Sequence, residues 1–309
     1  MLRRVLLSAS TNEAAKRLVA DLPVSRDVVA RFVAGETVED AGRVTRRLIA
    51  EGLYVTLDHL GEDTLDAQRA AAMARAYVTL LARLADSGLA DCAEVSVKLS
   101  AIGRALPGDG EKIAREHAHE ICAAAAAAGT TVTLDMEDHT TTDSTLAVLR
   151  DLRVEFPWVG AVLQSYLRRT EADCRDLAYE GSRVRLCKGA YKEPASVAHQ
   201  SAADVDAAYV RCLKLLVSGP GYPMIATHDP RLVAIAESFV RQYGRAKGSY
   251  EFQMLYGVRP GEQRRLAALG EKVRVYLPYG VDWYGYFLRR LAERPANVGF
   301  FLRALVTTS

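Results

Sequence analysis

Short runs of apolar or alternating apolar and polar residues recur eight times along the chain. They occupy residues 54–60, 94–100, 131–137, 159–165, 183–189, 222–228, 250–256 and 272–278. These runs are rich in β-branched and aromatic residues, which favour strands because such side chains pack well on a pleated surface. The pattern predicts eight strands.

The segments between the runs have the composition of helices. Residues 66–86 and 110–128 are rich in alanine, the strongest helix former, and Gly129 stands where a helix commonly ends. Strands that alternate with helices form a parallel sheet, because neighbouring parallel strands need a crossover between them. Eight such units close a (β/α)8 barrel. A doubly wound open sheet is less favoured, since no strand leads into a G-x-G-x-x-G turn.

The first 50 residues differ from the rest. Apolar positions recur there at steps of three and four residues on both sides of Pro23, including Val28, Val29, Phe32 and Val33. We therefore expect residues 1–50 to form an N-terminal helical segment packed on the barrel. Residues 51–309 would form the catalytic barrel domain.

Composition and charge narrow the class of protein. The formal net charge is +2 and no basic run stands out, so we expect no nucleic-acid partner. Five cysteines without a C-x-x-C pair argue against a disulfide framework or a zinc site and favour a reducing compartment. No apolar window reaches the length of a membrane span. We expect a cytoplasmic protein, with peripheral contact at the inner face of the membrane left open.

Polar side chains stand at the ends of the predicted strands, where a barrel carries its reactive groups. They are Asp58, His59, Lys98, Asp135, Glu137, Gln164, Arg185, Lys188, Thr227, His228, Gln253 and Tyr276. Each has an ordinary alternative: Asp135 could cap a helix, and Arg185 could pair with Asp135. Polar groups are costly to bury unless paired, so their recurrence on eight strands favours a functional site.

The segment WYGYFLRRLAERPANVGFFLR, residues 283–303, adds a second candidate. As a helix it places Tyr286, Arg289, Arg290 and Glu293 on one face, opposite an apolar face. Adjacent arginines repel each other, and a shared anion would offset that repulsion. The planar guanidinium suits a carboxylate or a phosphate.

Five motifs give the chain a family resemblance. They are SVKLS (96–100), RLCKGAY (185–191), ATH (226–228), EFQMLYG (251–257) and YFLRRLAERPAN (286–297). With these motifs the chain resembles the proline dehydrogenase family in its monofunctional bacterial form. Members are FAD-dependent enzymes that oxidise L-proline to Δ1-pyrroline-5-carboxylate, the first step of proline degradation to glutamate. The resemblance extends from about residue 50 to residue 303.

The resemblance implies roles for individual residues. Asp135, Arg185 and Tyr276 would be catalytic, and Lys98, Tyr286, Arg289, Arg290 and Glu293 would bind proline. FAD would be held by Met136, Gln164, Arg185, Lys188, Gly189, Ala190, Thr227, His228, Gln253 and Tyr256. The resemblance further implies a membrane quinone as electron acceptor. It also implies a separate pyrroline-5-carboxylate dehydrogenase that takes the product.

Two other classes of function remain open on the residues alone. A cofactor-free barrel aldolase or lyase could use Lys98 or Lys188 as a Schiff-base lysine, with Arg289 and Arg290 binding a phosphate. A non-catalytic barrel could bind an amino acid.

Overall fold

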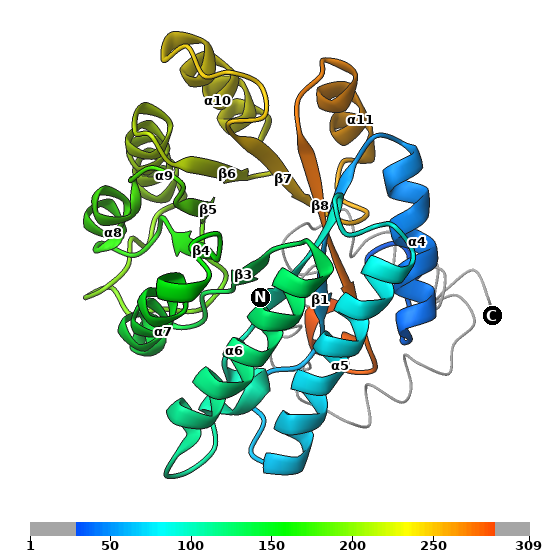
Figure 1. Ribbon diagram of the computed structural model, residues 1–309. Helices are drawn as coiled ribbons and strands as arrows, with labels where there is room; N and C mark the ends of the chain where they lie inside the picture. The colour runs from blue at the N-terminus through cyan, green and yellow to red at the C-terminus, as the bar shows by residue number, and fades with distance from the viewer. Residues whose placement is uncertain (1–28, 288–309) are drawn as a thin grey trace, which may run out of the picture.

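The structure is a computed structural model, and it describes residues 29–287. Within that range eight parallel strands close into a barrel in sequence order, and β8 pairs with β1 (Figure 1). The strands are β1 (Tyr54–His59), β2 (Ala93–Val97), β3 (Val132–Leu134), β4 (Gly160–Gln164), β5 (Arg183–Cys187), β6 (Tyr222–Ala226), β7 (Glu251–Leu255) and β8 (Val273–Tyr279). The (β/α)8 barrel expected from the sequence is confirmed.

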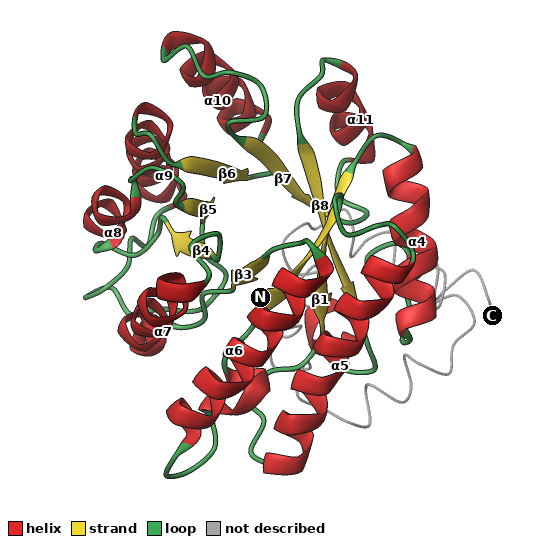
Figure 2. Cartoon of the chain, in the orientation of Figure 1, coloured by secondary structure: helices red, strands yellow, loops and turns green. Residues whose placement is uncertain are grey.

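Helices surround the ring of strands, as Figure 2 shows in red around yellow. They are α4 (Val38–Ala50), α5 (Ala67–Asp86), α6 (Gly110–Ala128), α7 (Thr142–Glu155), α8 (Thr170–Leu177), α9 (Ala202–Ser218), α10 (Pro230–Gln242) and α11 (Pro260–Ala268), with short turns η1 (Ser100–Arg104) and η2 (His139–Thr141). None of the helices in the described part of the chain is both long and apolar enough to span a membrane.

Helix α4 packs against β1 and β8 and so covers the seam where the barrel closes. Thr37 begins the helix with a capping box: its hydroxyl accepts from the backbone N–H of Asp40, and the Asp40 carboxylate accepts from the Thr37 backbone. The helical expectation for the residues just before α4 is wrong. Residues 31–37 form a turn and irregular backbone, although Phe32 and Val33 are buried. Residues 1–28 lie outside the described part of the chain.

The interior of the barrel is polar. The carboxylate of Glu94 on β2 accepts from the Thr56 hydroxyl on β1 at 2.8 Å and from Arg183 Nη2 on β5 at 2.5 Å. Strands β2 and β5 are not neighbours in the ring, so this contact runs through the barrel. Because side chains alternate between the two faces of a strand, the intervening Val95 and Val184 face the helices. An apolar shell therefore encloses a core of paired charges.

Candidate active site

Charged and polar side chains from five strands meet inside the barrel near the C-terminal ends of the strands. Asp135, directly after β3, is the centre of this group. Its Oδ1 accepts from Arg185 Nη1 and from the Ser96 hydroxyl, each at 2.7 Å, and its Oδ2 accepts from the Tyr276 hydroxyl at 2.6 Å. Lys98, directly after β2, donates to both carboxylate oxygens of Asp58 at 3.0 Å. The residues that the sequence places at strand ends, including Asp135, Arg185 and Tyr276, are therefore neighbours in the structure.

Each strand places its side chain in this group through the barrel register. Ser96 on β2 lies opposite Asp58 on β1, and Val97 accepts the backbone N–H of Asp135 at 2.9 Å. Because β3 ends at Leu134, the carboxylate of Asp135 reaches the interior just above the layer of Ser96. The sequence analysis gave a salt bridge between Arg185 and Asp135 as the alternative to a functional role. That salt bridge is present, and it forms part of the site.

The charge state of Lys98 follows from its carboxylate neighbours. Burial alone would lower the pKa of this ammonium, but the charges of Asp58 and Asp135 outweigh burial and raise the pKa above its ordinary value. Lys98 Nζ also lies 3.9 Å from Asp135 Oδ2. Lys98 is therefore a fixed cation at neutral pH, and a poor nucleophile for a Schiff base.

Tyr276 is held as a neutral phenol. Burial and the nearby charges of Asp135 and Asp58 raise the pKa of Tyr276 far above that of a free tyrosine. Its ring also lies beneath the Arg185 guanidinium, 5.3 Å from the guanidinium carbon. The phenol can therefore donate a proton in a hydrogen bond to Asp135 while its ring supports Arg185.

Deeper in the barrel, a second layer of charges supports this group. Gln253 accepts from Arg185 Nε and donates to Glu251 Oε1 at 2.6 Å. Glu251 in turn accepts from Arg274 Nε at 2.7 Å, and Arg274 Nε lies 3.6 Å from Glu94. The position of Arg185 is thus fixed from two sides, by Asp135 above and by Gln253 below.

Most residues of this second layer were not predicted from the sequence. Its members stand two residues apart within single strands, as in Glu94-x-Ser96-x-Lys98, Arg183-x-Arg185, Glu251-x-Gln253 and Arg274-x-Tyr276. A spacing of two places side chains on one face of a strand. This spacing predicts the polar interior of the barrel. The strand ends taken alone predict only the upper layer of charges. Asp58 was recognised at a strand end but was not assigned a role.

Several residues expected to hold a cofactor lie at the end of β4 or on the loop after β6. Gln164 is buried and donates to the Glu137 carbonyl at 2.7 Å. His228 Nε2 accepts from the Leu255 backbone N–H at 2.8 Å, which leaves Nδ1 to carry the proton of the neutral ring. The Thr227 hydroxyl accepts from the Asp229 N–H at 3.1 Å.

The other residues expected to hold FAD differ in their burial and in their contacts. Met136 is buried, and Ala190 is exposed. Lys188 Nζ lies 2.5 Å from Asp206 and 3.4 Å from Asp229. Tyr256 accepts from Arg47 Nη2 of α4 at 2.6 Å, a contact that the sequence did not suggest.

Gly189 requires a backbone that other residues rarely adopt. Its φ is +116°, and a Cβ at this position would lie 2.3 Å from the ring of Tyr166. The loop after β5 therefore passes flat against that ring, and it exposes its backbone at a point where a bound group could approach closely.

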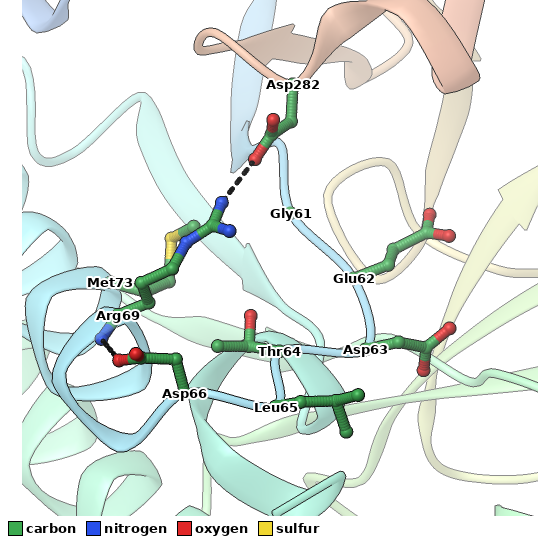
Figure 3. A pocket seen from close by; sticks show the side chains of 9 residues that line it. All are labelled: Gly61, Glu62, Asp63, Thr64, Leu65, Asp66, Arg69, Met73 and Asp282. Atoms are coloured by element: carbon green, nitrogen blue, oxygen red, sulfur yellow. Dashed lines mark hydrogen bonds and ion pairs between the residues drawn. The ribbon is translucent and has the colours of Figure 1, made fainter. Parts of the chain in front are cut away.

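Of the expected substrate-binding residues, Tyr286 is buried on a helix that begins at residue 283. Arg289, Arg290 and Glu293 lie outside the described residues. A pocket of about 370 Å³ adjoins the mouth of the barrel, lined by the loop after β1 together with Arg69, Met73 and Asp282. Figure 3 shows Arg69 and Asp282 facing each other across this pocket, with Nη2 and Oδ2 3.7 Å apart. Glu62 on the same loop contributes to the raised pKa of Lys98.

The fold and the paired charges define a (β/α)8 barrel with carboxylates and cations paired at the C-terminal ends of its strands. Comparison with known proteins gives the family. The model of the proline dehydrogenase family matches residues 41–303, so the chain belongs to that family and is an oxidoreductase of proline catabolism.

Individual relatives agree with this membership. The chain is 38% identical to proline dehydrogenase 1 of Bacillus subtilis over 306 residues, covering 99% of both chains. It is 41% identical to the proline dehydrogenase of Deinococcus radiodurans over 278 residues, covering 89% of each. Among solved structures, proline utilization A from Bdellovibrio bacteriovorus, inactivated by N-propargylglycine, matches with a TM-score of 0.82 and 24% identity. That match covers 95% of this chain and 36% of the other, and it supports the fold.

Proposed function

We propose that this chain uses bound FAD to oxidise L-proline to Δ1-pyrroline-5-carboxylate and passes the electrons to a membrane quinone. Family membership supports the substrate, and the position of Arg185 carries the cofactor. Arg185 is a buried cation near the C-terminal ends of the strands, where Asp135, Ser96 and Gln253 hold three of its hydrogen bonds and Glu94 Oε1 lies 3.9 Å from its Nη2. A positive charge fixed beside a flavin would stabilise the anionic reduced form of that cofactor.

The other residues for FAD would come from the end of β4 and from the loops after β5 and β6. Gln164 and Thr227 are buried there, and His228 follows Thr227 in the chain. Lys188 would supply a positive charge for a phosphate, and the backbone at Gly189 would permit close approach. FAD, when bound, supplies the acceptor for a hydride from the ring carbon next to the proline nitrogen.

The protein's own groups bind and polarise the substrate in this proposal. Arg289 and Arg290 would hold the proline carboxylate, with Glu293 paired to the arginines and Tyr286 and Tyr276 lining the pocket. Lys98, as a fixed cation, favours the uncharged amine of proline by raising the free energy of its ammonium form. Asp135 keeps Arg185 and Tyr276 in place and balances the charge of Arg185. Held in one orientation, the substrate gains effective molarity toward the cofactor.

Purified protein tests the proposal directly. We expect a yellow preparation whose visible flavin absorption bleaches on addition of L-proline, together with proline-dependent reduction of a dye. Hydroxyproline run in parallel measures the preference between the two substrates. A preparation that stays colourless in added FAD, or that binds FAD but is not reduced by proline, would refute the proposal. Borohydride trapping with a carbonyl substrate tests the aldolase alternative, which the carboxylate-bound Lys98 disfavours.

The proposal also includes the electron acceptor and the enzyme that uses the product. Quinone reduction in lipid vesicles, compared with detergent-dispersed quinone, measures whether peripheral membrane contact assists turnover. The product would pass to a separate pyrroline-5-carboxylate dehydrogenase. The candidate membrane contact is the N-terminal segment VLLSASTNEAAKRLVADL, residues 5–22, which lies outside the described part of the chain. Vesicle binding that survives deletion of residues 1–12 would show that this segment is not the anchor.

A further inference from the structure

Residues 31–36, which we call the arm, contact the chain where it leaves β8. The Ala34 N–H donates to the Pro278 carbonyl at 2.9 Å, and the Gly280 N–H donates to the Gly35 carbonyl at 2.9 Å. The chain turns after Gly280 and begins a helix at residue 283. The arm therefore fixes the point from which that helix starts.

Two side chains of the arm then contact the first turn of the helix. Glu36 Oε1 accepts from the indole Nε1 of Trp283 at 3.1 Å. The Phe32 ring lies 6.3 Å from the Phe287 ring in a tilted arrangement. Trp283 and Phe287 stand four residues apart, so they share one face of the helix, and their rings are 6.1 Å apart. The arm thus contacts the helix at both ends of one turn.

Two glycines fix the path of the arm, one in the loop after β7 and one within the arm itself. Gly257, in the loop after β7, has a φ of +74°, and a Cβ there would lie 1.8 Å from the Arg31 carbonyl oxygen. Gly35 has a φ of +136°, and a Cβ there would lie 2.5 Å from the side chain of Asp40. The arm lies against the loop after β7 and the exit from β8, and the backbone permits little movement between them.

We propose that the arm is a positioning element for the substrate-binding helix, and that Glu36 and Phe32 set the affinity for proline without contacting it. The inference rests on the proposed function, in which this helix binds the substrate. Tyr286 lies between the two residues that the arm contacts, and Arg289 and Arg290 follow Phe287 closely in the sequence. A rotation of the helix about its first turn would shift Tyr286.

Kinetics of Glu36→Ala and Trp283→Phe test the arm, because each variant removes the hydrogen bond between the Glu36 carboxylate and the indole. In each variant we expect the KM for proline to rise about tenfold, which corresponds to about 1.4 kcal/mol. We expect kcat and FAD content to change less than about twofold, because Glu36 and Trp283 touch neither reacting atoms nor the FAD-binding segments proposed at the ends of β4, β5 and β6. The double variant should match either single variant, since both remove the same hydrogen bond. Phe32→Leu provides a second test that keeps an apolar side chain.

Glu39→Ala is the matched control, because Glu39 pairs with Arg83 on the exposed surface just beyond the arm. We expect it to leave the KM unchanged. A lowered Tm with an unchanged KM in Glu36→Ala, Trp283→Phe and Phe32→Leu would overturn the positioning role and leave the arm as a structural element. Failure of the proposed function gives a different result, since the unaltered protein would then show no proline-dependent flavin reduction at all.

Discussion

Replacing Glu94 by glutamine tests whether the paired charges inside the barrel are needed for stability. Glu94 is fully buried on β2. Its carboxylate accepts from Arg183 and from the hydroxyls of Thr56 and Thr131. Glutamine keeps the volume but removes the negative charge among these cations. Breaking a buried ion pair from one side costs about 3–5 kcal/mol, because the partner charge is left uncompensated.

The expected loss can be measured as a shift in Tm. At about 1.5–2 °C per kcal/mol for a chain of 309 residues, we expect the Tm of Glu94→Gln to fall by roughly 5–10 °C at pH 7. Asp151→Asn is the control, since Asp151 forms an exposed pair with Arg115 and should change stability by less than about 0.5 kcal/mol. A fall of less than about 2 °C in Glu94→Gln would refute the reasoning.

The pH dependence of this difference follows from the direction of the pKa shift. Burial alone would raise the pKa of Glu94, but Arg183, Arg274 and Arg185 outweigh burial and lower it. A carboxyl with a lowered folded-state pKa contributes stability fully above its unfolded value of about 4.3. That contribution is lost as pH falls through the folded value. The Tm difference between wild type and Glu94→Gln should therefore be largest at pH 6–7 and shrink below about pH 4.

Three further substitutions address the site. Gly189→Ala places a methyl group against the neighbouring tyrosine ring at a positive φ, so we expect the purified protein to lose bound FAD, measured as flavin released per chain, while remaining folded by circular dichroism. Tyr276→Phe removes the 2.6 Å hydrogen bond to Asp135. It should lower kcat/KM for proline by about 10- to 150-fold, the equivalent of about 1.5–3 kcal/mol, with FAD content unchanged. Arg289→Met and Arg290→Met should each raise the KM for proline strongly, by about 1.5–3 kcal/mol of lost carboxylate binding, and an unchanged KM in both would contradict the carboxylate clamp.

The barrel could be predicted because each strand carries its own local signal. The run at 131–137, for example, alternates apolar and polar residues between two helical segments, and the structure places β3 there. The site could be predicted in part for a geometric reason. Residues at the ends of parallel strands, such as Asp135 and Arg185, must share one rim of a closed barrel.

Contacts between distant parts of the chain could not be predicted in the same way. No local pattern pairs Arg47 with Tyr256, or Glu36 with Trp283, because such partners are chosen by tertiary packing. The turn at residues 31–37 was read as helix since its buried apolar residues have helical spacing. Hydrogen bonds and ring contacts to the exit of β8 decide its conformation instead.

The polar interior has a consequence for how the barrel assembles. Arg274 belongs to β8, and its carboxylate partners belong to β7 and β2, so the second of these pairings exists only once the last strand has met the first. A half-barrel would leave cations and carboxylates on a bare sheet face, where water separates them and their attraction is small. These pairings therefore stabilise the barrel only when the ring of strands closes. We expect unfolding to be a single cooperative transition rather than a stepwise loss of β/α units, and isolated halves of this barrel to associate poorly when mixed.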